Sequence, residues 1–176
     1  MRKPFCVIQA GGTNPAALPA MSSAHTLEIV EFEPAHQPFF EALNRAWIEK
    51  FFRMEPLDYE MLRHPEERIL KKGGRIFMAR AEGEWVGTAT LIRLSSTTYE
   101  LSKVAVDERF RGRKIGQRLT KTAIEAARDS GGEKIVLYSN KILVPALALY
   151  RKLGFHEVPV DGPYERSDIK MELLLT

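Results

Sequence analysis

The fold is decided by residues 98–127, "TYELSKVAVDERFRGRKIGQRLTKTAIEAA". Residues 98–106 are rich in β-formers and predict a strand. From Ile115 onward, apolar residues recur every fourth position, which is typical of one face of a helix. The basic loop between these elements contains Gly112 and precedes Gly116. A loop that opens a helix suits an anion, because the first backbone N–H groups lack intrahelical partners and lie at the positive end of the helix dipole.

The two-residue period of a strand assigns each side chain of residues 98–106 to a face. It predicts Glu100, Ser102, Val104 and Val106 on one face of the sheet. Lys103 then belongs to the opposite face, together with the other odd-numbered residues of the strand, Tyr99, Leu101 and Ala105.

Positive charge is concentrated in this part of the chain. Between Lys103 and Lys121, seven cationic side chains stand against two acids, a local balance of +5, whereas the whole chain carries +3. Such a cluster fits either a compact polyanion or a solvated basic face. Gly116 is followed by Gln117 and Arg118, which is not the phosphate-loop pattern, and "GRKIG" is not the dinucleotide pattern, so ATP and NAD are weaker candidates.

Composition favours one soluble domain. The chain has 176 residues, is 44% hydrophobic and 28% charged, and has no apolar run of the roughly 18 residues that a membrane span requires. Its single cysteine, Cys6, permits no intrachain disulfide, and we expect a cytoplasmic location. The four histidines show no metal-ligand spacing with each other or with Cys6, so we expect no metal site.

Residues 1–25 differ from the rest in their Gly, Pro, Ala and Ser content. We expect them to form a poorly ordered extension, with translation starting at Met21 as one explanation, and residues 26–176 to form the domain.

The remaining patterns predict an α+β fold with a mixed, mostly antiparallel central sheet flanked by helices. In the first helix, the aromatic row at every fourth position is expected to be core, with a substrate pocket at the helix end as an alternative. The segment 53–74 predicts turns and short helices. The expected strands are 26–33, 75–81, 85–94, 98–106, 133–140, 155–158 and 168–175. The expected helices are 39–52 (with Phe39, Leu43, Trp47 and Phe51 in the row, and Phe40 alongside), 115–128 and 145–154.

Two motifs carry a family resemblance. "VAVDERFRGRKIGQRL" (104–119) resembles the acetyl-CoA signature of the GNAT N-acetyltransferases, and "LYSNKILVPALALYRKLGF" (137–155) resembles their later strand, loop and helix. The order of elements is also similar over 26–174. The resemblance implies the acyl-CoA N-acyltransferase fold and acetyl transfer from acetyl-CoA to a primary amine, without a metal.

The resemblance also implies which residues hold the acetyl-CoA. The strand edge would pair with the pantetheine arm, and the loop would hold the pyrophosphate, with Arg118 assisting. Lys114 stands where the family usually has a glycine, and we expect its charge to assist. Asn140 is implied as a pantetheine contact, at a longer spacing from Tyr150 than is usual. The implied contacts are Val104, Ala105 and Val106 on the edge, Arg111, Gly112, Arg113, Lys114, Ile115 and Gly116 in the loop, and Asn140.

Two further residues are implied in the chemistry. Glu100 corresponds to an acidic position that relatives use as the base, acting through water, and Tyr150 corresponds to the proton donor for the departing thiolate. The other interpretation of Glu100 is an acid paired with a neighbouring cation, and that of Tyr150 is a core tyrosine.

Two other functions remain open at this point. One is a non-catalytic acetyl-CoA sensor. The other is a nucleic-acid module, which is disfavoured because the aromatic residues of 39–52 do not interleave with the basic segment. The acceptor is an amine of a small molecule or a protein and is expected to contact residues 53–74 and 141–145. A homodimer is possible, as in many relatives.

Overall fold

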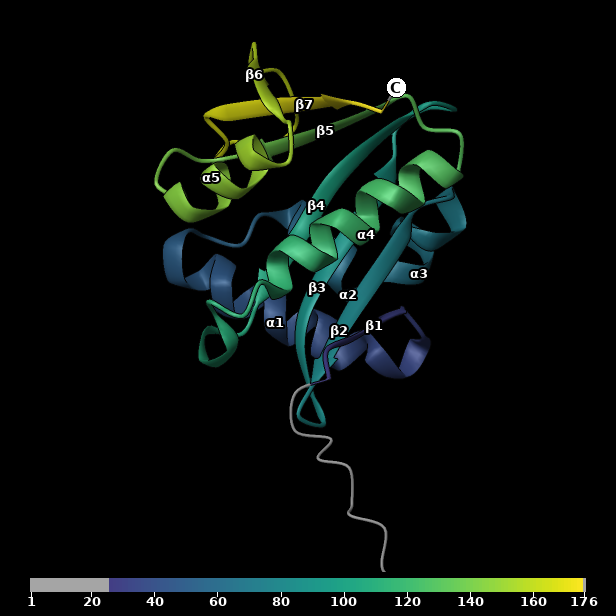
Figure 1. The fold of residues 1–176 in the computed structure, drawn as a ribbon, viewed down its shortest axis with the longest axis vertical. Helices are drawn as coiled ribbons and strands as arrows, with labels where there is room; N and C mark the ends of the chain where they lie inside the picture. Colours follow the sequence, from purple (N-terminus) through teal and green to yellow (C-terminus); the bar gives the residue numbers. More distant parts are fainter. Residues whose placement is uncertain (1–25, 176) are drawn as a thin grey trace, which may run out of the picture.

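The computed structural model describes residues 26–175, so the prediction for residues 1–25 lies outside it. Seven strands form one sheet in the order β1-β2-β3-β4-β5-β7-β6 (Figure 1). All neighbouring pairs are antiparallel except β4 and β5. The predicted α+β class is confirmed. The strands are β1 (Glu28–Glu31), β2 (Arg75–Ala81), β3 (Glu84–Arg93), β4 (Thr98–Val106), β5 (Lys134–Ser139), β6 (His156–Val158) and β7 (Ile169–Leu174).

Helices cover both faces of the sheet, with α4 crossing one face and α1 and α2 lying behind it (Figure 1). Residues of α4 and α5 share one hydrophobic cluster, and residues of α1 and α2 belong to another. The segment 53–74 contains short helices, as predicted. The helices are α1 (Gln37–Phe51), α2 (Pro56–Arg63), α3 (Pro65–Arg68), α4 (Ile115–Asp129) and α5 (Val144–Lys152), with short 3₁₀ turns η1 (Pro34–His36), η2 (Leu70–Lys72) and η3 (Glu108–Phe110).

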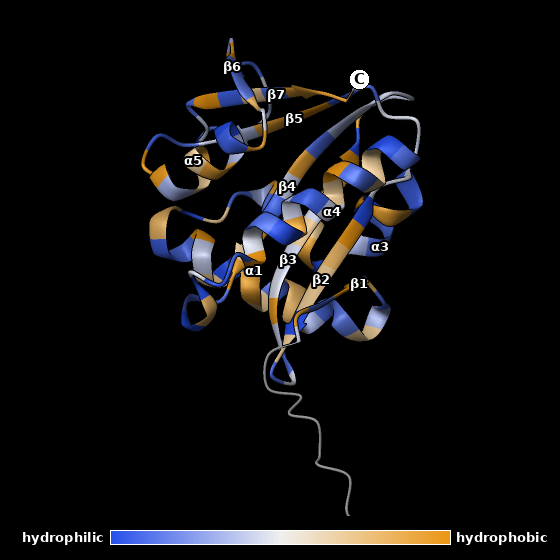
Figure 2. Ribbon diagram, in the orientation of Figure 1, coloured by the Kyte–Doolittle hydropathy of each residue, from blue (hydrophilic) through white to orange (hydrophobic). Residues whose placement is uncertain are grey.

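Helix α4 packs closely on β3 because a glycine lies beneath it. The predicted apolar stripe of α4, formed by Ile115, Leu119, Ala123 and Ala127, is buried. Hydrophobic and polar residues alternate along the ribbon of this helix (Figure 2). A Cβ atom added at Gly87 would lie 2.9 Å from Leu119 Cδ1. The absence of a side chain at Gly87 therefore sets the distance between the helix and the sheet.

Helix α1 buries a different row from the one predicted. Phe40, Asn44 and Ile48 are buried, whereas Phe39 and Phe51 are 46% and 41% exposed, so the prediction of a buried row containing Phe39 and Phe51 is wrong for these two residues. Both rows have helical spacing and lie side by side on the helix, and contact with the sheet decides between them. The buried Asn44 is satisfied, because its side-chain amide donates to the Phe40 carbonyl at 2.9 Å.

Strand β4 contains a bulge at Lys103. Thr88 is paired with Ala105 and Thr90 with Ser102, so the register shifts between these pairs, and Lys103 has a left-handed φ of 49°. The bulge changes the face on which Lys103 lies. Its ammonium group donates to Asp58 Oδ1 of α2 at 2.6 Å, with both side chains buried.

Strict alternation therefore fails after Glu100. Glu100 is paired in register with Ile92, which belongs to the cluster of α1 and α2, and directly opposite residues of an antiparallel pair share a face. Glu100 and Lys103 both turn toward the side of α1 and α2, which corrects the predicted placement of Lys103 on the opposite face.

We predict that Asp58→Asn lowers the free energy of unfolding at pH 7 by about 3–5 kcal/mol, because it leaves two cations without their shared partner. Lys103 and Arg166 both bond to Asp58. Glu60→Gln serves as the matched control on the same helix, because Glu60 pairs with Arg68 at the surface, and its removal is expected to cost less than about 1 kcal/mol. Urea denaturation measures both changes, and equal effects would contradict the prediction.

The difference between wild type and Asp58→Asn should also depend on pH. Burial by itself raises the pKa of Asp58, but the Arg166 hydrogen bond and the charge of Lys103 outweigh it and lower the pKa from 3.8 to about 2. A lowered carboxyl pKa adds stability above the unfolded value, and this stability is lost as the pH falls from about 4 toward 2. The difference in unfolding free energy should narrow over this range, and a constant difference down to pH 2.5 would contradict the assignment.

Candidate active site

The site is an opening between β4 and β5. These parallel strands are paired only at Thr98 with Lys134, Tyr99 with Ile135 and Glu100 with Val136. Beyond these pairs, within residues 26–175, no ladder joins the two strands. A cavity of about 680 Å³ lies at the opening, and its wall includes residues of α1 from one face of the sheet and residues of α4 and α5 from the other. The cavity therefore connects the two faces.

One end of the cavity lies at the start of α4. Arg111, Gly112, Lys114, Ile115 and Gly116 all contribute to its wall. No side chain caps the helix, since Lys114 occupies the N-cap position without a side-chain cap hydrogen bond. The first amide groups of α4 are therefore free of side-chain caps, as an anion site requires.

Two residues of this loop, Gly112 and Lys114, have a left-handed backbone conformation, which favours glycine and is strained for lysine. Gly112 has a φ of 79°, which favours glycine, and Lys114 has a φ of 61°, also left-handed. At Gly116 an added Cβ would make ordinary contacts, 3.6 Å from Val106 and 3.9 Å from Leu149. Packing within the protein therefore does not require glycine at 116.

Much of the charge counted along the basic segment is paired in three dimensions. Arg109 bonds to Glu84 at 2.7 Å and to Asp107 at 2.8 Å. Arg113 pairs with Glu82 and does not line the cavity. The two glutamates belong to the β2–β3 hairpin, which is distant in sequence, so the local balance of +5 overstates the charge available to a ligand.

Val104 and Val106 line the cavity from the open edge of β4, whereas Ala105 is buried in the core. The indole N–H of Trp47 donates to the Val104 carbonyl at 2.9 Å. This bond joins the end of α1 to the bulged part of β4, so one carbonyl of the predicted pantetheine edge already has a partner within the chain.

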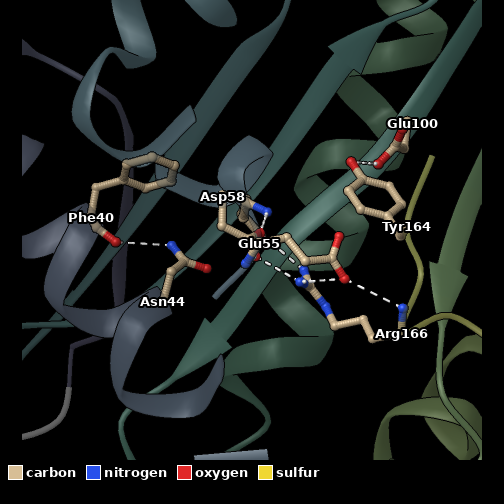
Figure 3. A network of polar contacts seen from close by, with 8 residues as sticks. Phe40, Asn44, Glu55, Asp58, Glu100, Tyr164 and Arg166 are labelled. Carbon is tan, nitrogen blue, oxygen red and sulfur yellow. Dashed lines mark hydrogen bonds and ion pairs between the residues drawn. The ribbon is translucent and has the colours of Figure 1, made fainter. Parts of the chain in front are cut away.

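The carboxylate of Glu100 lies in the wall of the cavity and is 5% exposed. It accepts a hydrogen bond from the Tyr164 hydroxyl at 2.8 Å (Figure 3). Burial raises the pKa of Glu100, and the Tyr164 hydrogen bond partly opposes this rise. The direct partner of Lys103 is Asp58, so Glu100 forms no ion pair among the described residues.

The β6–β7 loop, residues 159–168, is tied to α2 beside this carboxylate. Arg166 makes a bidentate contact with Asp58, at 2.6 and 2.9 Å, and also pairs with Glu55 at 3.2 Å (Figure 3). Sequence analysis missed Tyr164 and Arg166. No local pattern marks them, because their partners lie more than 60 residues away.

Tyr150 lines the cavity from α5, on the face opposite Glu100. Its ring packs edge-on against Phe155 at 5.8 Å, and the residue is 9% exposed. Burial raises the pKa of Tyr150 to about 12. Tyr150 is thus partly a core residue, and it keeps its proton at neutral pH.

Asn140 also lines the cavity, but its side chain is engaged within the chain. Its amide nitrogen donates to the Arg166 carbonyl at 2.7 Å, and its oxygen accepts from the Ile142 backbone at 3.1 Å. The side chain therefore fixes the β5–α5 loop and the β6–β7 loop relative to each other.

The residues that line the cavity differ in part from the segments expected to contact the acceptor, 53–74 and 141–145. None of residues 53–74 lines it, whereas Ile142, Leu143 and Pro145 do, together with the end of α1. The acids of 53–74 are used in other contacts, such as the surface pairs of Glu60 and Glu67. Within the described part of the chain, no group of three or more His, Cys, Asp or Glu side chains is arranged for a metal, and no helix has the length and hydropathy of a membrane span.

Sequence comparison finds the same resemblance. Residues 36–155 match the family described as Acetyltransferase (GNAT) family. The chain is 37% identical over 91 residues to N-alpha-acetyltransferase RimI of Mycobacterium tuberculosis, a match that covers 50% of this chain and 56% of that protein. It is 32% identical over 88 residues to N-acetyltransferase 8B of Homo sapiens, covering 47% and 39%. These matches span about half the length of the two relatives or less.

Solved structures share the fold. A GNAT-family acetyltransferase of Staphylococcus aureus Mu50 superimposes with a TM-score of 0.79 at 21% identity, covering 86% of this chain and all of that one. The PaiA N-acetyltransferase of Thermoplasma acidophilum, solved in complex with coenzyme A, superimposes with a TM-score of 0.67 at 20% identity, covering 85% and 99%.

We predict that Lys114→Gly unfolds with a free energy about 1 kcal/mol higher than Lys114→Ala, because only glycine adopts the left-handed N-cap conformation without a steric cost. Both variants remove the same charge, so the comparison isolates the backbone. Thermal or urea unfolding measures the difference. If the alanine variant were the more stable, Lys114 would not be strained in the folded protein.

Proposed function

This chain belongs to the GNAT acetyltransferase family, and on that premise we propose that it transfers the acetyl group of acetyl-CoA directly to a primary amine of a small molecule or a protein. One observation carries the proposal. A buried carboxylate, Glu100, and a buried phenol, Tyr150, line one cavity from opposite faces of the sheet. A cavity open to both faces allows a donor and an acceptor to meet without a covalent enzyme intermediate.

The residues of the cavity fit acetyl-CoA as the donor. The uncapped start of α4, with Arg111, Gly112, Lys114 and Gly116, offers amide groups and cations to a pyrophosphate. Bound acetyl-CoA supplies the activated acyl group as a thioester. The backbone of Val104, Ala105 and Val106 would pair with the pantetheine arm, as a strand added to an open edge does.

Glu100 would act as the base. A lysine-like amine with a pKa near 10.4 is neutral only about once in a few thousand molecules at pH 7, so a proton has to be removed before the nitrogen attacks. Burial raises the pKa of Glu100, which makes its carboxylate a stronger base than an exposed one. The proton would pass to Glu100 through a water and then to solvent.

The amine nitrogen would then attack the thioester carbonyl carbon. A C–N bond forms and the C–S bond breaks. The nitrogen would give up its second proton through the same water to Glu100, which has already passed the first proton to solvent, and this leaves a neutral amide. Backbone N–H groups on the edge of β4 would stabilise the negative charge that develops on the carbonyl oxygen. Tyr150, whose raised pKa of about 12 keeps it protonated, would donate its proton to the departing sulfur and recover one from solvent.

We predict that Tyr150→Phe lowers kcat by roughly 10²-fold, because removal of the hydroxyl removes the acid but leaves the ring packed against Phe155. Affinity for CoA should stay unchanged. Glu100→Gln should lower kcat to a similar extent. CoA release, followed chromatographically over a panel of amines, and calorimetric titration with CoA measure the two quantities.

Three outcomes would contradict this proposal. An unchanged kcat in Tyr150→Phe or Glu100→Gln would remove the role of that residue. Stoichiometric acetyl-CoA binding without CoA release for any amine would instead indicate a non-catalytic sensor.

We further predict that Tyr164→Phe moves the acidic limb of the pH profile of kcat/KM to higher pH. The Tyr164 hydroxyl stabilises the ionised form of Glu100, so its loss raises the pKa of that carboxyl further. Tyr138→Phe is the matched control, because Tyr138 also lines the cavity and its ring lies 5.5 Å from that of Tyr164. Equal profiles for wild type and Tyr164→Phe would show that Glu100 is not the titrating base.

A further inference from the structure

We infer that the acceptor is a primary amine that carries a bulky apolar or aromatic group and no second charge. The inference rests on the proposed function and names the class of substrate for the same site. It depends on three features of the cavity, which are the side from which the acceptor enters, the aromatic wall on that side and the charges close to Glu100.

The acceptor would enter from the side of α1 and α2. Glu100 lies on this face, since its register partner Ile92 packs with residues of these helices. The start of α4 and Tyr150 belong to the opposite face. An amine that gives its proton to Glu100 therefore meets the end of α1 and the β6–β7 loop before it reaches the thioester.

Aromatic rings dominate this side of the cavity. Trp47, Phe51 and Phe52 come from the end of α1, and the rings of Trp47 and Phe52 lie 5.9 Å apart. Tyr138 and Tyr164 also line the cavity, with ring centroids 5.5 Å apart. Phe51 is 41% exposed. A ligand with an apolar body would cover these rings and remove apolar surface from water.

The charge balance around Glu100 favours the binding of one ammonium group. Within residues 26–175, Glu100 is the only acidic residue in the wall of the cavity. The two nearby cations, Lys103 and Arg166, are held by Asp58 and Glu55. The acids Glu55 and Asp58 balance the cations Lys103 and Arg166. When Glu100 is ionised, its negative charge is therefore the one that has no cationic partner.

A second positive charge on the acceptor would meet cations of the protein. Lys50 lies 5.7 Å from the centroid of the Phe51 ring. Lys103 and Arg166 lie 5.9 and 5.7 Å from the centroid of the Tyr164 ring. All three cations are paired with acids of the protein. They already lie over the rings that a second ammonium group would use for cation–π contact, so these rings offer it no such contact.

A carboxylate next to the amine is also disfavoured. In a free α-amino acid the carboxylate lies within a few ångströms of the amine and would therefore approach Glu100. The cations on this side are already bonded to Asp58 and Glu55, so they offer no free charge to compensate it. The favoured sources are a small apolar amine and a peptide N-terminus with a large apolar first residue.

The test uses matched pairs of amines. Heptylamine and hexane-1,6-diamine have the same chain length and differ in a terminal methyl against a second ammonium group. 2-Phenylethylamine and phenylalanine differ by the carboxylate. We expect the first member of each pair to have a kcat/KM roughly tenfold higher or more. Two peptides that begin with Phe or Ser and are otherwise identical test whether the acceptor is a peptide N-terminus. In that case we expect the Phe peptide to be the better substrate.

Phe51→Ala tests the aromatic wall. It should lower kcat/KM for heptylamine roughly tenfold and leave that for ethylamine, which has little apolar surface to bury against the ring, much less affected. Phe39→Ala is the matched control, because Phe39 belongs to the same helix, is 46% exposed and does not line the cavity. It should change neither value. Both side chains are at the surface, so both variants are expected to fold.

Binding measured separately from turnover distinguishes the inference from the proposed function. The same amines are titrated calorimetrically into the protein saturated with CoA. Tighter binding of heptylamine than of the diamine, reduced in Phe51→Ala, supports the inference even if no acetyl group is transferred. Equal binding within both pairs, or the same heptylamine affinity in Phe51→Ala and wild type, overturns it, while acetylation of any amine would leave the proposed function standing.

Discussion

The separation of two parallel strands is the constraint on which the site depends. β4 and β5 share hydrogen bonds at three residue pairs and none beyond Glu100 and Val136 in the described chain. A sheet normally closes such a gap, because unpaired backbone groups are costly when they are buried. Here the gap forms a cavity that joins the two faces of the sheet, so groups from α1 on one side and from α4 and α5 on the other meet at one place.

Buried charge holds the elements around this gap together. Asp58 bonds to Lys103 on the bulge of β4 and to Arg166 on the β6–β7 loop. A carboxylate with two cationic partners is well compensated for its loss of water, whereas either cation alone would be costly in the interior. The same loop places the Tyr164 hydroxyl on Glu100. The geometry of the proposed base is therefore connected to the packing of α2, which does not line the cavity itself.

Much of the fold could be predicted from local pattern. The range predicted for β4 is the one observed, and α4 begins at Ile115 as expected, because alternation and helical period each refer to near neighbours in the chain. The predictions are wrong where contacts with distant segments of the chain decide the burial, the face or the partner of a side chain. Phe39 and Phe40 both fit helical spacing, and contact with the sheet buried only Phe40. At Lys103, a left-handed residue changed the face on which the side chain lies. The cations near α4, Arg109 and Arg113, pair with Glu84 and Glu82, which lie 25 and 31 residues away along the chain.

The sequence by itself determined the order of strands and helices, the basic glycine loop before α4, and the presence of Glu100 and Tyr150 at positions that resemble those of the family. These depend on local spacing and on residue type. Only the tertiary structure decided that Glu100 is buried against Tyr164, that Arg166 is held by Asp58, and that aromatic rings from the end of α1 line the cavity. The physical reason is that burial and pairing energies depend on distances in space between groups far apart in the chain, which no local pattern specifies.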